Sequence, residues 1–152
     1  MDPTRSPSQV LSDLVAATNA HDLDGLVDCF ATDYVLTDPA HPARSFVGSA
    51  QVRKNWGTLF AAMPDLRFEL QQHVVTDDGF WMEGAQSGTR PDGAVMHAQM
   101  VFLAVVAAGC VTRAHIYVVP VEPGGPDINA VMAAMAGPPV EPGSRGPAGG
   151  RP

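Results

Sequence analysis

The sequence predicts an α+β fold in which a curved sheet folds around helices from the first half of the chain. Apolar residues recur at helical spacing in three segments before Pro64. After Pro64 the spacing changes to the alternation of β-strands and continues to about residue 119. Turn sequences divide this second half into four strands, the pattern of an antiparallel meander. Helices followed by such a meander are typical of the α+β class.

Three helices and one strand are expected in the first half. Ser8 is placed to cap a helix over residues 8–19, and Asp22 a second helix with the apolar face Leu23, Leu26, Val27 and Phe30. Residues 34–38 form a short apolar strand. Pro39, Pro42 and Gly48 then break the chain into a loop, and a third helix runs from Ser49 to the residues before Pro64.

Four strands are expected in the second half, over residues 66–72, 80–89, 95–106 and 111–119. The turns between them are Asp77-Asp78-Gly79, Arg90-Pro91-Asp92-Gly93 and Ala107-Ala108-Gly109. Pro120 closes a single domain over residues 8–120. A short extension over residues 121–136 has the apolar periodicity of one helix, and residues 137–152 are rich enough in Pro and Gly to predict disorder.

Composition excludes several functional classes. The chain has 152 residues and a net charge of −7, and its nine Lys and Arg form no run, which argues against nucleic-acid binding. No apolar stretch is long enough to span a bilayer, and the N-terminus has no signal-peptide core, so we expect a cytoplasmic protein without membrane contact. Cys29 and Cys110 lack metal-ligand spacing. No phosphate loop or cofactor motif is present, which predicts a protein with no metal and no cofactor.

Asp38 stands out because it lies late in the short apolar strand, directly before Pro39. Burial disfavours the charged form of a carboxyl group, which suits such a group to proton transfer. Asp-Pro is also a common turn opener, so the alternative is that Asp38 caps a turn.

Three segments carry a family resemblance: residues 19–26 (Asn-Ala-His-Asp-Leu-Asp-Gly-Leu), the Asp38-Pro39 pair, and the junction at residues 63–68. With the order of elements, they resemble the nuclear-transport-factor-two-like superfamily, in particular its SnoaL-like polyketide cyclases and ketosteroid isomerases, over residues 8–120. The resemblance implies a cone-shaped, antiparallel or mixed sheet around three helices (a cystatin-like α+β barrel). It also implies an apolar pocket inside the cone and pairing of two copies through the outer sheet face.

The resemblance also implies catalytic positions. Asp38 matches the general base of ketosteroid isomerases, while the two oxyanion-donor positions of that family fall on Leu14 and Gln99. Leucine cannot donate a hydrogen bond, whereas the Gln99 amide can. Loss of an oxyanion donor typically costs about 2.7–4 kcal/mol in transition-state stabilisation, which argues against steroid isomerisation by the familiar mechanism.

Strand alternation groups the meander residues by face, and the resemblance implies which face lines the pocket. We expect His97, Gln99 and Val101 to face the pocket, with His97 either a proton shuttle or a half-exposed strand histidine. On the preceding strand we expect Met82, Gly84 and Gln86 to face it. On the last strand we expect Ala114 and Ile116, although a slip of one residue would turn His115 and Tyr117 inward instead.

The predicted site therefore has Asp38, His97 and Gln99 as catalytic residues. Its ligand-binding wall comprises Leu14, Tyr34, Asn55, Trp56, Phe60, Met82, Gly84, Gln86, Val101, Ala114 and Ile116. Tyr34 and Asn55 are its polar members from the first half of the chain, and each offers a hydrogen bond to a ligand oxygen.

The function predicted from the sequence is that of a cofactor-independent isomerase or cyclase. Asp38 would move a proton next to the carbonyl group of a hydrophobic, polyketide-like or terpenoid-like molecule, in a homodimer. One alternative is water addition of the epoxide-hydrolase type, using Tyr34, Asp38, Asn55 and Arg113. The other is a dimeric module that binds small molecules without catalysis.

Overall fold

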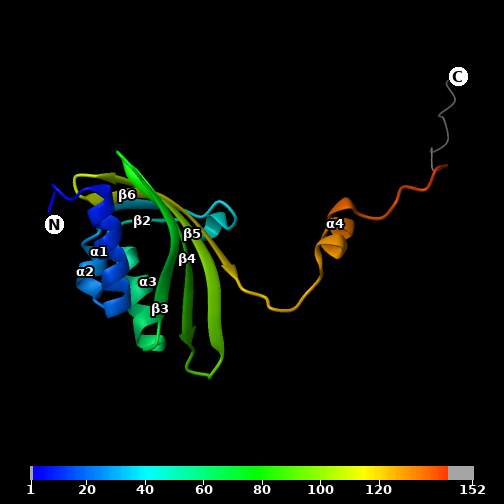
Figure 1. The fold of residues 1–152 in the computed structure, drawn as a ribbon, viewed down its shortest axis with the longest axis horizontal. Coiled ribbons are helices and arrows are strands. Elements are labelled where there is room, and N and C mark those ends of the chain that lie inside the picture. Colours follow the sequence, from blue (N-terminus) through cyan, green and yellow to red (C-terminus); the bar gives the residue numbers. More distant parts are fainter. Residues whose placement is uncertain (1, 144–152) are drawn as a thin grey trace, which may run out of the picture. The chain divides into compact units, whose positions relative to one another are not determined.

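The curved sheet and its helices form one layered unit in the computed structural model, which describes residues 2–143. Helices α1 (Pro7–Ala20), α2 (Leu23–Val27) and α3 (Ser49–Ala62) lie against the concave side of the sheet (Figure 1). The strands are β1 (Phe30–Thr37), β2 (Phe46–Val47), β3 (Arg67–Thr76), β4 (Gly79–Thr89), β5 (Val95–Ala107) and β6 (Cys110–Pro120).

The sheet has the order β2-β1-β6-β5-β4-β3. β1 runs parallel to β6, and the other neighbours are antiparallel, so the sheet is mixed. This arrangement confirms the predicted α+β class and its curved, mixed sheet.

Local structure differs from the sequence prediction in three places. Ser6, rather than Ser8, caps α1 in a capping box with Gln9, and Pro7 occupies the first helical position. Phe30 begins β1 instead of continuing the face of α2. The expected loop after Pro39 contains a short 3-10 helix (Pro42–Arg44) and β2, which pairs with β1. Asp22 caps α2 as expected, with its side chain accepting from the backbone N–H of Gly25.

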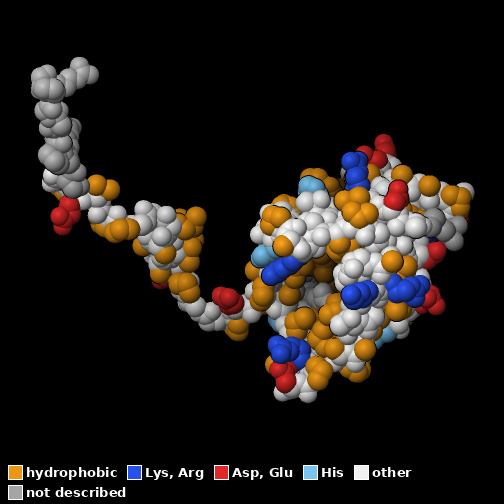
Figure 2. All heavy atoms as spheres, turned by 180° about the vertical axis from the view of Figure 1, so that it is seen from behind, with side chains coloured by type: hydrophobic (Ala, Val, Ile, Leu, Met, Phe, Trp, Pro, Cys, Tyr) orange, Lys and Arg blue, Asp and Glu red, His pale blue; other side chains and the backbone are white. Residues whose placement is uncertain are grey.

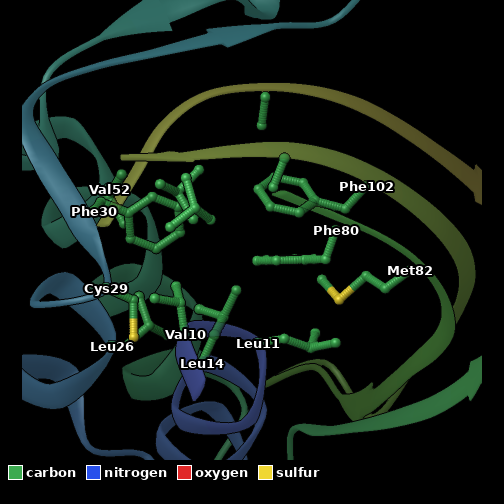
Figure 3. Close-up of a cluster of buried hydrophobic side chains, with 14 of the residues drawn as sticks. Val10, Leu11, Leu14, Leu26, Cys29, Phe30, Val52, Phe80, Met82 and Phe102 are labelled. Carbon is green, nitrogen blue, oxygen red and sulfur yellow. The ribbon is translucent and has the colours of Figure 1, made fainter. Parts of the chain in front are cut away.

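The core joins α1 to the concave face of the sheet. Leu11 and Leu14 of α1 point toward Phe80, Met82 and Phe102 of the sheet (Figure 3). All five are buried, and this burial of apolar surface is the main favourable term that holds the helices on the sheet.

Strand register decides which side chains reach this concave face. Thr89 pairs with Val95, so the loop between β4 and β5 has five residues, one more than the expected turn at 90–93. Even-numbered residues of β4 therefore lie opposite even-numbered residues of β5. A bulge at Val105 and Val106 keeps the same parity between β5 and β6, where Phe102 lies opposite Ile116.

The chain after Val121 is a second unit. It contains α4 (Ile128–Ala136), whose N-cap Asp127 accepts a hydrogen bond from the backbone N–H of Ala130. Ile128, Met132 and Met135 of α4 are exposed. Of the tail predicted to be disordered, residues 144–152 lie outside the described residues. Between residues 2 and 143, no helix has both the length and the apolar character needed to cross a bilayer.

Arg5 ties the N-terminal segment to two other parts of the domain. Its guanidinium donates to the carbonyl of Asp28 at 2.6 Å and to that of Gly109 at 3.1 Å. It also forms an ion pair with Asp13 at 3.3 Å, and its side chain is only 12% exposed. Because it is largely buried, its loss would leave two carbonyl groups short of a charged donor.

We expect Arg5→Met to lower the free energy of unfolding by about 1–3 kcal/mol, because a largely buried charged donor to the carbonyl of Gly109 and the ion pair with Asp13 are lost together. Chemical denaturation measures this loss. The control is Arg90→Met, because Arg90 forms an exposed ion pair with Asp92 and such pairs contribute about 0–1 kcal/mol. Equal effects of the two substitutions would contradict the anchoring role of Arg5.

Candidate functional site

An apolar cavity of about 340 Å³ lies between the helices and the concave face of the sheet. Figure 2 shows a hollow in the domain surface with hydrophobic side chains inside it. Aromatic and methionine side chains make up much of the wall, namely Phe30, Tyr34, Phe46, Trp56, Phe68, Met82, Met96, Met100 and Phe102. Such a wall suits a hydrophobic molecule of ligand size.

Four polar side chains also line the cavity: Thr18, Tyr34, Asn55 and Gln86. The Thr18 hydroxyl donates to the carbonyl of Leu14 at 2.7 Å. The Asn55 carbonyl oxygen accepts from Gln51 at 2.7 Å, which leaves its amide N–H groups for another acceptor. Within residues 2–143, no hydrogen bond reaches the Tyr34 hydroxyl or the Gln86 amide.

Tyr34 and Gln86 are buried in spite of this, with exposed fractions of 1% and 7%. Buried polar groups are usually hydrogen-bonded, because an unpaired group loses its bonds to water. Two such groups in one cavity point to a ligand that carries hydrogen-bonding atoms.

Tyr34 is packed edge-on against Phe30 and Phe46, with ring centroids 4.8 and 6.0 Å away. Burial among these rings raises the pKa of the Tyr34 hydroxyl well above its ordinary value, since the charged phenolate is poorly solvated there. Tyr34 therefore stays protonated near neutral pH and is available as a hydrogen-bond donor.

Asp38 directly follows β1 and continues the alternation of Tyr34 and Leu36, two residues that line the cavity. It is buried, with 6% of its surface exposed, but it is not part of the cavity wall. Its Oδ1 accepts from the backbone N–H of His41 at 2.9 Å, and His41 Nδ1 lies 3.4 Å from the same oxygen. Asp38 also donates its backbone N–H to Ser45 Oγ at 3.0 Å.

Asp38 thus has the two features that the sequence left as alternatives. It is held in a loop by turn-like hydrogen bonds, and it is also a buried carboxyl next to the cavity strand. Oδ2 forms no hydrogen bond with any residue in the described part of the chain.

The expectation that His97, Gln99 and Val101 face the cavity is wrong. Met96, Met100 and Phe102 line it instead, and the alternation of β5 turns the odd-numbered residues to the outer face. The strand bounds are not at fault, because the expected strands over residues 80–89 and 95–106 already place Met82 opposite Phe102 and Gln86 opposite Ala98. The error lies in the resemblance, which aligned Gln99 with an oxyanion-donor position of the family. Gln99 therefore cannot serve as an oxyanion donor inside the cavity of this chain.

Three further predicted wall residues lie outside the cavity wall. Phe60 stacks on His21, with ring centroids 4.4 Å apart, and packs against Trp56. Gly84 faces the ring of Phe68, which occupies the space that a ligand was expected to fill. Ala114 lies on the concave side but is buried in the core.

Leu14, Tyr34, Asn55, Trp56, Met82, Gln86 and Ile116 are the predicted residues that do line the cavity. The last strand has the register in which Ile116 faces inward, while Tyr117 is on the outer face, opposite Val101. The predicted site missed Val15, Thr18, Phe30, Leu36, Phe46, Val52, Leu59, Phe68, Met96, Met100, Phe102 and Val118. The expected strand bounds, which leave five residues between β4 and β5, would have identified Met96, Met100 and Phe102 without the alignment of Gln99, whereas no periodicity marks Phe46 in its two-residue strand.

No cluster of three or more His, Cys, Asp or Glu side chains suited to a metal ion occurs among residues 2–143. Cys29 and Cys110 are free and buried, and burial raises the pKa of the Cys29 thiol to about 11. Cys29 is therefore a poor nucleophile at neutral pH.

The model of a family described as a SnoaL-like domain matches residues 11–114. The search of curated proteins finds no match for this chain.

Several solved structures share the fold. An NTF2-like protein from Burkholderia thailandensis has a TM-score of 0.65 and 21% identity over 87% of this chain and 98% of its own. IdmH, a putative polyketide cyclase from Streptomyces antibioticus, has a TM-score of 0.63 and 21% identity over 86% and 98%. AclR, a putative hydroxylase from Streptomyces galilaeus, has a TM-score of 0.64 and 18% identity over 88% and 97%. At these identities the likeness establishes the fold alone.

The raised pKa of Tyr34 gives a testable pH dependence. In a Tyr117→Phe variant, Tyr34 is the only tyrosine. We expect tyrosinate absorbance of the folded protein to appear well above the ordinary pKa of about 10, or only on unfolding. Because the native pKa is the higher one, stability is retained below pH about 10 and falls as the pH rises beyond it.

The control for this titration is the same variant unfolded in guanidinium, where Tyr34 is solvated. Circular dichroism at each pH reports whether the chain is still folded. A native protein whose Tyr34 titrates in the ordinary range would show that the hydroxyl is hydrated rather than buried.

Proposed function

Because this chain belongs to the SnoaL-like family, we propose that it is a cofactor-independent isomerase or cyclase acting on a hydrophobic carbonyl compound. The observation that carries the proposal is the apolar cavity with unpaired polar groups beside a buried carboxyl. The putative polyketide cyclase among the similar structures supports a polyketide-like substrate, and a terpenoid-like one has the same apolar character.

Asp38 is the general base in this proposal. The hydrogen bond from His41 to Oδ1 fixes the carboxylate, and Oδ2 is then the oxygen that accepts a proton from the carbon next to the substrate carbonyl. The same oxygen returns the proton to another position, so no net consumption of protons occurs. Asp38 directly follows the strand that supplies Tyr34 and Leu36 to the cavity wall, and catalytic hydrogen bonds in a free enzyme are often longer than in its complex.

Asn55 and Tyr34 stabilise the enolate oxygen that forms when the proton leaves. The bond from Gln51 orients the Asn55 amide, so its N–H groups are free to donate. Tyr34 stays protonated for the reason given above. Tyr34, which is buried in the cavity wall, stabilises a developing negative charge strongly because little water competes with it, whereas the exposed Asn55 contributes less.

A non-catalytic binding module is the second candidate, and it is favoured by the position of Asp38 outside the cavity wall. In that case Tyr34, Asn55 and Gln86 bind a ligand without turnover. Water addition has weaker support, because Arg113, which that reaction would use, is exposed.

We also propose that the protein is a homodimer through the outer face of the sheet. Trp81, Val101, Tyr117 and Val119 lie on this face, and their exposed fractions run from 37% to 62%. Gln99 Oε1, on the same face, is buried without a hydrogen bond to any described residue. A second copy would cover the apolar residues and offer a donor to that oxygen.

Proton transfer can be tested before the substrate is known. The probe is 4-(4-hydroxyphenyl)cyclohexanone, an apolar ketone with exchangeable protons next to its carbonyl, in D₂O. We expect the protein to accelerate deuterium incorporation, measured by NMR, and Asp38→Asn to lower that rate about a hundredfold or more. Asparagine retains the oxygen that accepts from His41, so the loop is preserved.

The matched control is Asp33→Asn, the same change at an exposed position of β1. It should exchange deuterium at the wild-type rate. Binding of the probe with no acceleration by the wild type would favour the binding module, and an active Asp38→Asn variant would refute Asp38 as the base.

Pairing of two copies through the outer face predicts that a charge introduced on that face disrupts the dimer. Val101 lies opposite Glu83, so Val101→Lys gains a favourable neighbour and should fold. We expect sedimentation at micromolar concentration to show a wild-type dimer and a Val101→Lys monomer. Val47→Lys, the same change at an exposed valine of β2, serves as the control and should remain a dimer.

A further inference from the structure

Gln86 is the cavity residue for which the proposed reaction has no use. It projects from β4, and its cross-strand neighbours are Phe68 on β3 and Ala98 on β5. Both neighbours are apolar and buried, so neither side chain can pair with the amide. More than nine-tenths of Gln86 is buried, it lines the cavity, and within residues 2–143 its amide has no hydrogen-bond partner.

The amide atoms still reach the cavity space, where water or a ligand can bind to them, but a polar group in this apolar wall costs stability relative to an apolar one. A methionine or leucine would fill the same space at no such cost, and Met82, Met96 and Met100 do so around it. The polar atoms of Gln86 are therefore best explained by a ligand that satisfies them.

Gln86 also lies far along the sheet from the groups assigned to the reaction. Tyr34 and Asp38 belong to β1 and its end, which β6 and β5 separate from β4 in the sheet. Positions along β6 show this separation. Val35 of β1 pairs with Arg113, near the start of β6. Ala98 of β5, which lies opposite Gln86, pairs with Pro120, the last residue of β6. The two polar regions thus face different ends of the cavity.

We propose that Gln86 is a specificity-determining residue that binds a second oxygen of the ligand, remote from the carbonyl at which the proton moves. The ligand class is then an elongated apolar molecule with an oxygen function at each end. A carbonyl oxygen would accept from the Gln86 amide N–H, and a hydroxyl would donate to its carbonyl oxygen. The inference rests on the proposed function for the reacting end, but the recognition by Gln86 is measurable by binding alone.

The test compares two ketones with one skeleton. 4-Phenylcyclohexanone carries oxygen at one end only, and 4-(4-hydroxyphenyl)cyclohexanone carries a second oxygen at the other end. Isothermal titration calorimetry of the full chain should show tighter binding of the hydroxylated ketone. Gln86→Met keeps the length of the side chain and removes the amide, so affinity for the hydroxylated ketone should fall roughly five- to tenfold.

The matched control is Gln99→Met, the same change on the neighbouring strand but on the outer face. It should keep the wild-type preference for the hydroxylated ketone. Gln86→Met should unfold at the same temperature as the wild type or higher, because it removes an unpaired buried group. A loss of affinity without a loss of stability separates ligand recognition from a structural role.

Three outcomes would overturn the proposal: wild-type protein that binds neither ketone, wild-type protein that binds both equally, or a Gln86→Met variant that retains the preference. The deuterium exchange experiment is independent of these. Failure of exchange with a preserved preference would refute the base and leave Gln86 as a recognition residue. Exchange without the preference for the hydroxylated ketone would support Asp38 as the base and refute Gln86 as a recognition residue.

Discussion

The pairing register of β4 with β5 is the constraint on which the cavity depends. The five-residue loop between them sets the parity of every cross-strand pair, and the bulge near the end of β5 carries that parity on to β6. As a result, Met82, Gln86, Met100 and Ile116 all project to the concave side. Shifting this register by one residue would replace them with charged and polar residues such as Glu83, which an apolar interior does not accommodate.

With this register, the fold has unpaired polar groups inside the cavity and exposed apolar side chains on the outer face of the sheet. Inside, Tyr34 and Gln86 are buried polar groups in a wall that is mostly apolar. Outside, apolar residues such as Trp81 and Val119 are exposed on the convex face. Both features reduce the stability of the isolated chain. Under the proposed function, a small molecule would relieve the first cost and a second copy of the chain the second.

The sequence predicted the fold well because its signals are local and repeated. Helical spacing in α1 and α3, strand alternation after Pro64, and Asp-Gly turns each specify an element within a few residues. The cavity wall was predicted less well, because its face on β5 was assigned from the alignment of Gln99 with a family position. The strand bounds alone pair even-numbered residues of β4 with even-numbered residues of β5, which places Met96, Met100 and Phe102 on the cavity face. β2 is two residues long, too short for any periodicity, and Phe46 was missed with it.

The position of Asp38 follows from the way β1 ends. The strand delivers Tyr34 and Leu36 to the cavity, and its pairing ends at Thr37, directly before Asp38 and Pro39. The carboxyl must therefore find its hydrogen bonds in the loop, and His41 supplies one through its backbone N–H. Because a backbone donor survives any substitution at His41 except proline, the orientation of Oδ1 depends on the fold of the loop. Oδ2 has no hydrogen bond to any residue between 2 and 143, and the proposed role of Asp38 as a base uses this second oxygen.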